Sequence, residues 1–78
     1  ILINTSCEHL NDFAAWFDGL PSGVLLVLQS NDYVSEPEHV NCVEDLKAFK
    51  AQAPLAHLAY AGGLELDKYT RFMLIGRK

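Results

Sequence analysis

The sequence is poor in cysteine, in positive charge and in long apolar runs. Two cysteines in 78 residues, Cys7 and Cys42, fall far below the density of a secreted disulfide scaffold. No apolar run approaches the roughly 20 residues that a membrane-spanning helix needs. Six Lys and Arg against ten Asp and Glu give a net charge of -4, which argues against binding to nucleic acid. These scarcities predict reduced thiols and a cytoplasmic protein, with neither membrane nor nucleic acid as partner.

Methionine is also scarce, because Met73 is the only one and the chain opens on Ile1-Leu2-Ile3. We interpret this tripeptide as the end of a buried strand whose beginning lies before this sequence. Hydrophobic residues make up 50% of the chain. A domain of this size buries only about 60% of its unfolded surface, so such a composition indicates a core that more protein completes. We therefore expect residues 1–78 to be a single partial domain, the C-terminal half of a larger one.

The first helix is expected over residues 5–20. An apolar stripe at i, i+3, i+4 and i+7 predicts it, formed by Leu10, Phe13, Ala14 and Phe17. Thr5 and Glu8 fit a capping box at its start, although Asn11 or Asp12 would cap a shorter helix instead. Gly19 is the expected end.

The remaining elements alternate between strands and one more helix. Val24–Leu28 has no polar alternation, which predicts a central strand with helices on both faces. After a loop, Asn41 and Glu44 can cap a second helix that ends before Pro54. Leu55–Ala61 and Tyr69–Ile75 are the expected last strands, with a bend or bulge at Gly62-Gly63.

This order predicts an α/β fold with a partial doubly wound sheet, strand-helix-strand-helix-strand-strand. The first three strands should be parallel, since helices connect them. The last two should form an antiparallel hairpin, since no helix separates them.

Three segments resemble the C-terminal half of class I, Rossmann-like S-adenosylmethionine-dependent methyltransferases, in particular small uncharacterised members. Ile1-Leu2-Ile3-Asn4-Thr5-Ser6-Cys7-Glu8-His9 resembles their fourth strand and the following loop. Leu20-Pro21-Ser22-Gly23-Val24-Leu25-Leu26-Val27-Leu28-Gln29-Ser30 resembles the entry into the fifth strand, and residues 69–78 resemble the reversed seventh strand. The resemblance implies S-adenosylmethionine as cofactor. It also implies that the glycine-rich loop and the acidic residue that hold this donor lie upstream of Ile1.

The candidate site lies where the parallel strands end, because ligands of open α/β sheets bind there. Asn4 to His9, Gln29 to Asn31, the loop from Glu65 to Lys68, and Tyr69 to Arg71 should converge at this edge. Glu8 or His9 is the candidate catalytic base, since imidazole titrates near neutrality. The alternative is that Glu8 caps a helix and His9 merely begins it.

Polar residues at the same edge are candidates for binding the substrate. They are Asn4, Gln29, Ser30, Asn31, Tyr69 and Arg71. Gln29, Ser30 and Asn31 would otherwise form an ordinary turn after the strand. Tyr69 and Arg71 would otherwise cover the sheet end, with Arg71 paired to an acid such as Asp67.

A metal site is not expected from this sequence. The alternative is a zinc set by residue type, made of Cys7, His9, His39 and Cys42. Its C-x-H and H-x-x-C spacings are not those of common zinc motifs.

The leading hypothesis is the substrate-side half of a methyltransferase that acts on a small polar molecule and is inactive as residues 1–78 alone. The alternative is a small, non-catalytic α/β interaction module. In both cases the Ile1–Ile3 edge is expected to pair, either with another copy or with a missing N-terminal half.

Overall fold

The computed structural model describes residues 1–78 as a mixed α/β fold with one four-stranded sheet. The elements in chain order are β1 (Leu2–Asn4), the 3-10 helix η1 (Cys7–His9), α1 (Phe13–Asp18), β2 (Leu25–Asn31), α2 (Leu46–Gln52), β3 (His57–Glu65) and β4 (Thr70–Arg77). The sheet has the order β1-β2-β4-β3. β1 and β2 are parallel, whereas β4 runs antiparallel to both of its neighbours. The expected succession of strands and helices along the chain and the final antiparallel hairpin are therefore confirmed.

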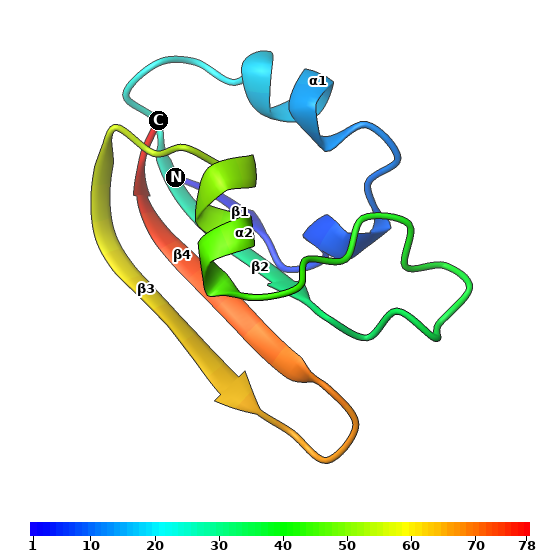
Figure 1. The fold of residues 1–78 in the computed structure, drawn as a ribbon. Helices are drawn as coiled ribbons and strands as arrows, with labels where there is room; N and C mark the ends of the chain where they lie inside the picture. Colours follow the sequence, from blue (N-terminus) through cyan, green and yellow to red (C-terminus); the bar gives the residue numbers. More distant parts are fainter.

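Both helices lie on the same face of the sheet (Figure 1). The steps from β1 to β2 and from β2 to β3 go in the same direction across the sheet. Two right-handed crossovers in one direction place their helices on one face. The expectation of helices on both faces of Val24–Leu28 is therefore wrong for residues 1–78, and a doubly wound arrangement is not confirmed.

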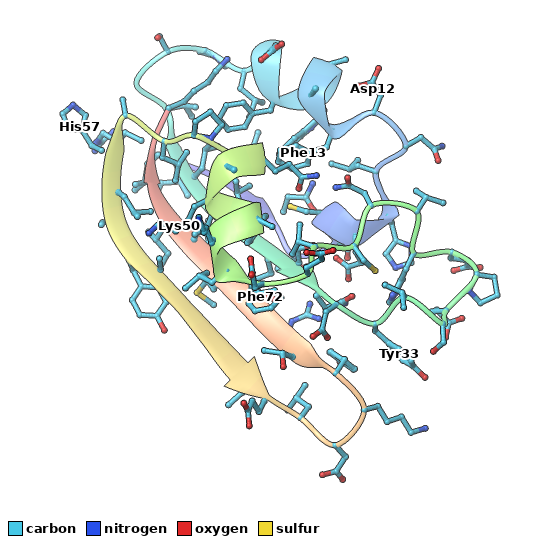
Figure 2. The ribbon with its side chains drawn as sticks, viewed as in Figure 1. Asp12, Phe13, Tyr33, Lys50, His57 and Phe72 are labelled. Carbon is cyan, nitrogen blue, oxygen red and sulfur yellow. The ribbon has the colours of Figure 1, made fainter.

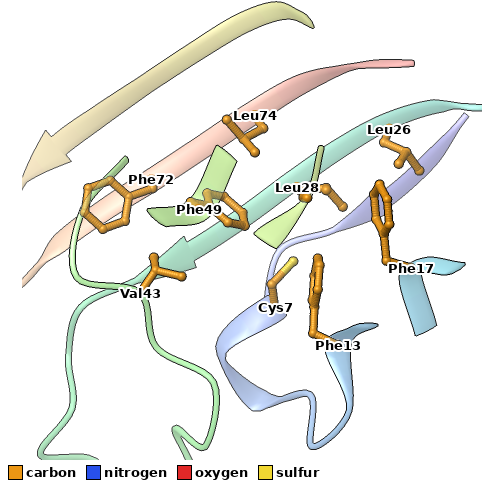
Figure 3. Packing of buried hydrophobic residues seen from close by; sticks show 10 residues of the cluster. Cys7, Phe13, Phe17, Leu26, Leu28, Val43, Phe49, Phe72 and Leu74 are labelled. Atoms are coloured by element: carbon orange, nitrogen blue, oxygen red, sulfur yellow. The ribbon is translucent and has the colours of Figure 1, made fainter. Parts of the chain in front are cut away.

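The core fills the space between the helices and the covered face (Figure 3). Alternate residues of the two central strands point into it, namely Leu26, Leu28, Phe72 and Leu74. Phe13 and Phe17 of α1 and Phe49 of α2 pack against them. The residues between them on the strands, such as Val27 and Ile75, face the other side and are only half-buried. One apolar face of the sheet thus remains without a cover.

The predicted helix over residues 5–20 is two separate pieces. Leu10 has an extended backbone and ends η1, and the side chain of Asp12 then caps α1 by accepting a hydrogen bond from the Ala15 N–H at 3.1 Å. The Thr5–Glu8 capping box is wrong, and the shorter helix capped by Asp12 is correct. Gly19 ends α1, as expected.

Other element boundaries also differ from the predicted ones. β2 continues through Gln29-Ser30-Asn31 because these residues pair with Met73, Phe72 and Arg71 of β4, so they are not a turn. α2 is capped by Asp45 rather than Asn41 or Glu44. Gly62 and Gly63 continue β3, and the register shift of a β-bulge lies earlier, between Leu58 and Tyr60.

Candidate functional site

A pocket of about 350 Å³ lies at the edge where β1 and β2 end and β4 begins. Residues 32–45, the connection between β2 and α2, supply part of its wall. Nine residues line it, and most of them are charged or polar: Glu8, His9, Asn31, Tyr33, Glu36, Glu38, His39, Tyr69 and Arg71. Figure 2 shows Tyr33 in this connection, at the opposite end of the sheet from His57.

A buried carboxylate lies in this pocket. Glu8 is only 3% exposed, and its Oε1 accepts a hydrogen bond of 3.0 Å from Asn31 Nδ2. Its second oxygen, Oε2, is buried and has no hydrogen-bond partner. A buried charged group normally has its hydrogen-bonding capacity filled, so the free oxygen makes Glu8 a candidate to contact a ligand or a water molecule.

Asn31 positions Glu8 and is itself fixed on several sides. Its Oδ1 accepts hydrogen bonds from the Tyr33 N–H at 3.2 Å and from the Cys42 thiol at 3.6 Å. Its backbone carbonyl accepts a bond of 3.0 Å from the Val43 N–H. The last residue of β2 therefore connects the carboxylate to the connection that closes the pocket.

Four aromatic rings form a continuous row along the pocket. Tyr69 and Tyr33 are stacked with centroids 5.1 Å apart, and Tyr33 meets His39 edge-on at 5.8 Å. His39 and His9 are T-shaped with centroids 4.7 Å apart. His39 Nδ1 also lies 2.8 Å from the Tyr33 carbonyl oxygen. The row brings both imidazoles beside the Glu8 carboxylate.

Asn41 attaches the connection to η1 and α2. Its N–H donates to the Glu8 carbonyl at 2.9 Å, and its Nδ2 donates to the Cys7 carbonyl at 3.0 Å. Gln52 of α2 donates from Nε2 to Asn41 Oδ1 at 2.7 Å. These bonds fix the backbone on both sides of the Glu8 side chain, so the carboxylate is held by its main chain as well as by Asn31.

Arg71 supplies the positive charge of the pocket. Its Nε donates to Gln29 Oε1 at 3.1 Å, and its terminal nitrogen donates to the Thr5 carbonyl at 2.8 Å. Gln29 itself lies on the uncovered face and lines a different hollow, of about 340 Å³, between β3 and β4. Arg71 thus joins the candidate pocket to the uncovered face.

Both thiols next to the pocket are held in the protonated form. Burial raises the pKa of the Cys7 thiol from 9.0 to about 12, and the neighbouring Glu8 carboxylate adds to the rise. Burial also raises the pKa of Cys42, with further contributions from Glu8 and Asp32. The thiolate is the form that binds metals and attacks electrophiles, so neither cysteine is prepared for these roles.

The pocket brings together five of the predicted site residues: Glu8, His9, Asn31, Tyr69 and Arg71. Three others lie elsewhere. Asn4 Oδ1 accepts from the Ser6 N–H in a local turn, Gln29 faces the other side of the sheet, and Ser30 is fully buried in the interior. Asp67 is not the partner of Arg71, which bonds Gln29 and Thr5.

The structure brings together a different set of potential metal ligands from the zinc set that the sequence offered. The three side chains whose ligand atoms lie within 4.8 Å of one another are Glu8, His9 and His39. Cys7 instead donates to the Asn4 carbonyl at 3.7 Å, and Cys42 donates to Asn31. The two histidines of the alternative set are together, but a carboxylate takes the place of its cysteines.

Sequence reasoning missed Tyr33, Glu36 and Glu38. They belong to the segment after β2, which has no periodicity and was expected only to be a loop. The available signal was its position, because loops at the carboxyl ends of parallel strands commonly hold functional side chains.

Searches of known protein families, curated proteins and solved structures give no match to this chain. None of its helices combines the length and the apolar character needed to cross a membrane.

Proposed function

We propose that residues 1–78 are the substrate-side half of an S-adenosylmethionine-dependent methyltransferase that acts on a small polar molecule. The observation on which the proposal depends is the pocket at the strand ends, with a buried Glu8 whose Oε2 is free. The reversed strand β4 supports it too, because the resemblance implies a reversed final strand. In the complete doubly wound fold, other parts of the protein would cover the open face of the sheet.

Residues of the pocket would bind and orient the methyl acceptor. Arg71 and Tyr69 offer donors for a carboxylate or phosphate of the acceptor, and the Tyr33–Tyr69 stack offers an apolar wall. Glu8 Oε2 is the free hydrogen-bond acceptor that can take a proton from a hydroxyl or amine. His9, exposed beside it, is the second candidate base.

The methyl donor does not fit these residues alone. The glycines of the chain lie at the end of α1, in the turn before β2, and within β3 and β4: Gly19, Gly23, Gly62, Gly63 and Gly76. None follows the carboxyl end of β1 or β2, where a glycine-rich loop would approach a cofactor. The proposal therefore places the donor on a part of the protein outside residues 1–78, and it assigns only acceptor binding and proton removal to this chain.

The test is methyl transfer by the product of the whole reading frame. That protein is incubated with S-adenosylmethionine bearing a labelled methyl group and a panel of small hydroxy acids, amines and phosphates. We expect labelled product from the wild type. Glu8→Gln or His9→Ala should lower turnover by about 10²–10⁴-fold, according to which side chain is the base, while donor affinity is unchanged.

His57→Ala is the matched control, since His57 is exposed and lies at the far end of β3. It should keep wild-type turnover. Absence of transfer to every acceptor would contradict the proposal, as would full turnover in both Glu8→Gln and His9→Ala.

A second candidate function is a non-catalytic interaction module that completes its sheet by self-association. The observation that favours it is the exposed apolar surface at the β1 edge, where Ile1 is 86% and Ile3 is 63% exposed. Self-association of a chain that transfers no methyl group would support this candidate over the enzyme.

A further inference from the structure

Three potential metal ligands converge in the pocket. One ligand atom from each of Glu8, His9 and His39 lies within 4.8 Å of the other two. The Glu8 side chain is more than nine-tenths buried, and its Oε2 has no hydrogen-bond partner. A free, buried carboxylate oxygen therefore lies beside two imidazoles, and all three groups can bind a metal ion.

We propose that Glu8, His9 and His39 bind one divalent transition-metal ion. Two imidazoles and one carboxylate are a common protein donor set for such ions, and they leave further coordination positions open. Bonds of about 2.1 Å would bring the ligand atoms to roughly 3–4 Å of one another, so binding requires a small approach. His9 is exposed and η1 is a single short turn, which allows that movement.

The residues around the ligands hold them in the form that binds metal. When His39 Nδ1 carries its proton, it donates to the Tyr33 carbonyl at 2.8 Å and leaves the lone pair on Nε2. Asn31 Nδ2 occupies Glu8 Oε1 and leaves Oε2 free. Hydrogen bonds of this kind to the outer atoms of ligands fix their orientation and commonly accompany metal sites.

The charge and type of the pocket residues define the class of ion. Glu36 and Glu38 add negative charge to the lining, so with Glu8 the pocket has three carboxylates against the one guanidinium of Arg71. Imidazole ligands favour Zn²⁺, Fe²⁺ and Co²⁺, whereas Mg²⁺ prefers oxygen ligands and retains its water. We therefore expect a preference for Zn²⁺ or Co²⁺ over Mg²⁺.

This inference depends only on the pocket and holds whether or not the protein transfers methyl groups. If it does, the ion and the base are alternative roles for Glu8 and His9. A bound cation would lower the pKa of an acceptor hydroxyl that coordinates it, so no side-chain base would be needed for that step. The remaining coordination positions would then select acceptors with a hydroxyl or carboxylate oxygen.

The experiment is calorimetric titration of residues 1–78 with Zn²⁺, and with Mg²⁺ for comparison, in a buffer that does not bind metal. One Zn²⁺ per chain is expected, without comparable heat from Mg²⁺. Co²⁺ provides a spectroscopic readout. A site of imidazole and carboxylate gives d–d bands without the near-ultraviolet charge-transfer band of a cobalt–thiolate bond.

The variants His9→Ala, His39→Ala and Glu8→Gln should each weaken Zn²⁺ binding by more than the 10–100-fold that loss of an outer hydrogen bond typically costs. His57→Ala should retain wild-type affinity. Because Glu8→Gln alters a buried group, circular dichroism checks its fold. His9→Ala removes an exposed side chain and tests the proposal even if Glu8→Gln does not fold.

Several results would overturn the inference. They are absence of Zn²⁺ binding by the wild type, a thiolate band in the Co²⁺ spectrum, and wild-type affinity in the His9→Ala, His39→Ala double variant. Equal weakening by His57→Ala would show binding that is not specific to the pocket. None of these measurements uses a methyl donor, so failure of the methyltransferase proposal leaves them unaffected.

Discussion

Asn31 Nδ2 donates to Glu8 Oε1 over 3.0 Å, and the two residues are 23 positions apart in the chain. Both side chains are at least 97% buried, as their exposures are 2% and 3%. A carboxylate removed from water without a donor is costly, so this bond stabilises the packing of η1 against the end of β2. Formation of the pocket and stability of the fold are therefore linked at this contact.

The first prediction concerns this contact. Asn31→Ala removes the donor to Glu8 and the acceptor for the Tyr33 N–H and the Cys42 thiol. We expect the free energy of unfolding to fall by about 2–4 kcal/mol, because a buried carboxylate loses its only hydrogen bond. Urea denaturation followed by circular dichroism measures the change.

Asn11→Ala is the control, because Asn11 is exposed and precedes α1. Its effect should stay within about 0.5 kcal/mol of zero, as for most surface substitutions. If Asn31→Ala were equally mild, Glu8 would have another source of stabilisation.

Much of the sheet could be predicted from the sequence because strand and helix patterns are local. The alternating order of elements and the absence of a helix before β4 were enough for the parallel pair and the final hairpin. The coverage of the second face could not be predicted, since a central apolar strand such as Val24–Leu28 has the same pattern whether one or two layers of helices cover it. That property depends on what else packs on the sheet, which local periodicity does not encode.

The position of the site could be predicted from the sequence, but the full set of residues that line it could not. Strand ends identified Glu8, His9 and Asn31, which do line the pocket. Gln29 and Ser30 were misplaced because the end of β2 was set too early. A strand reverses side-chain direction at every residue, so Ser30 points into the core while its two neighbours do not. Gln29 lies two residues before the strand end and contacts a different hollow.

The second prediction concerns Ser30, whose hydroxyl is fully buried without a hydrogen-bond partner. Ser30→Ala removes this unsatisfied group and loses little volume. We expect a gain of about 1 kcal/mol in the free energy of unfolding, seen as a rise of roughly 4–8 °C in the melting temperature. Ser22→Ala, at an exposed position before β2, should change nothing. A clear loss of stability in Ser30→Ala would mean that its hydroxyl is satisfied.

The third prediction concerns pH and follows from the pKa of Cys7, which rises from 9.0 to about 12 in the folded protein. Below the ordinary thiol pKa, both states keep the proton and the contribution to stability is complete. As the pH rises through this value, the unfolded chain loses its proton first, so stability falls until the folded thiol also ionises. The slope from this group approaches about 1.4 kcal/mol per pH unit.

Urea denaturation from about pH 8 to about pH 10.5 measures this slope. Cys7→Ala should reduce the slope relative to the wild type, although it also lowers stability at every pH because Cys7 is part of the core. An unchanged slope would show that Cys7 does not titrate differently in the two states.

The fourth prediction concerns the methyl donor. Residues 1–78 contain no glycine directly after the carboxyl end of β1 or β2, so this chain has no glycine-rich loop of its own that could approach the donor there. We therefore expect no S-adenosylmethionine binding by calorimetry for these residues alone, and binding by the product of the whole reading frame. Micromolar affinity of residues 1–78 would mean that the pocket itself holds the donor, and the assignment of the pocket to the acceptor would be wrong.

The last prediction concerns association through β1. This strand is an edge of the sheet, and Ile3 points to the uncovered face beside Val27. An unpaired edge next to an apolar face promotes association, both by strand pairing and by burial of apolar area. We expect residues 1–78 to sediment at micromolar concentration with a mass above the 8.7 kDa of one chain.

Ile3→Lys should shift the population toward the monomer, because it places a charge at this edge and on this face. Val34→Lys is the matched control, since Val34 is 75% exposed but lies in the connection after β2. It should associate as the wild type does. A monodisperse wild-type monomer would show that the open face and the β1 edge are tolerated in water, and it would remove the structural argument for pairing with a second copy.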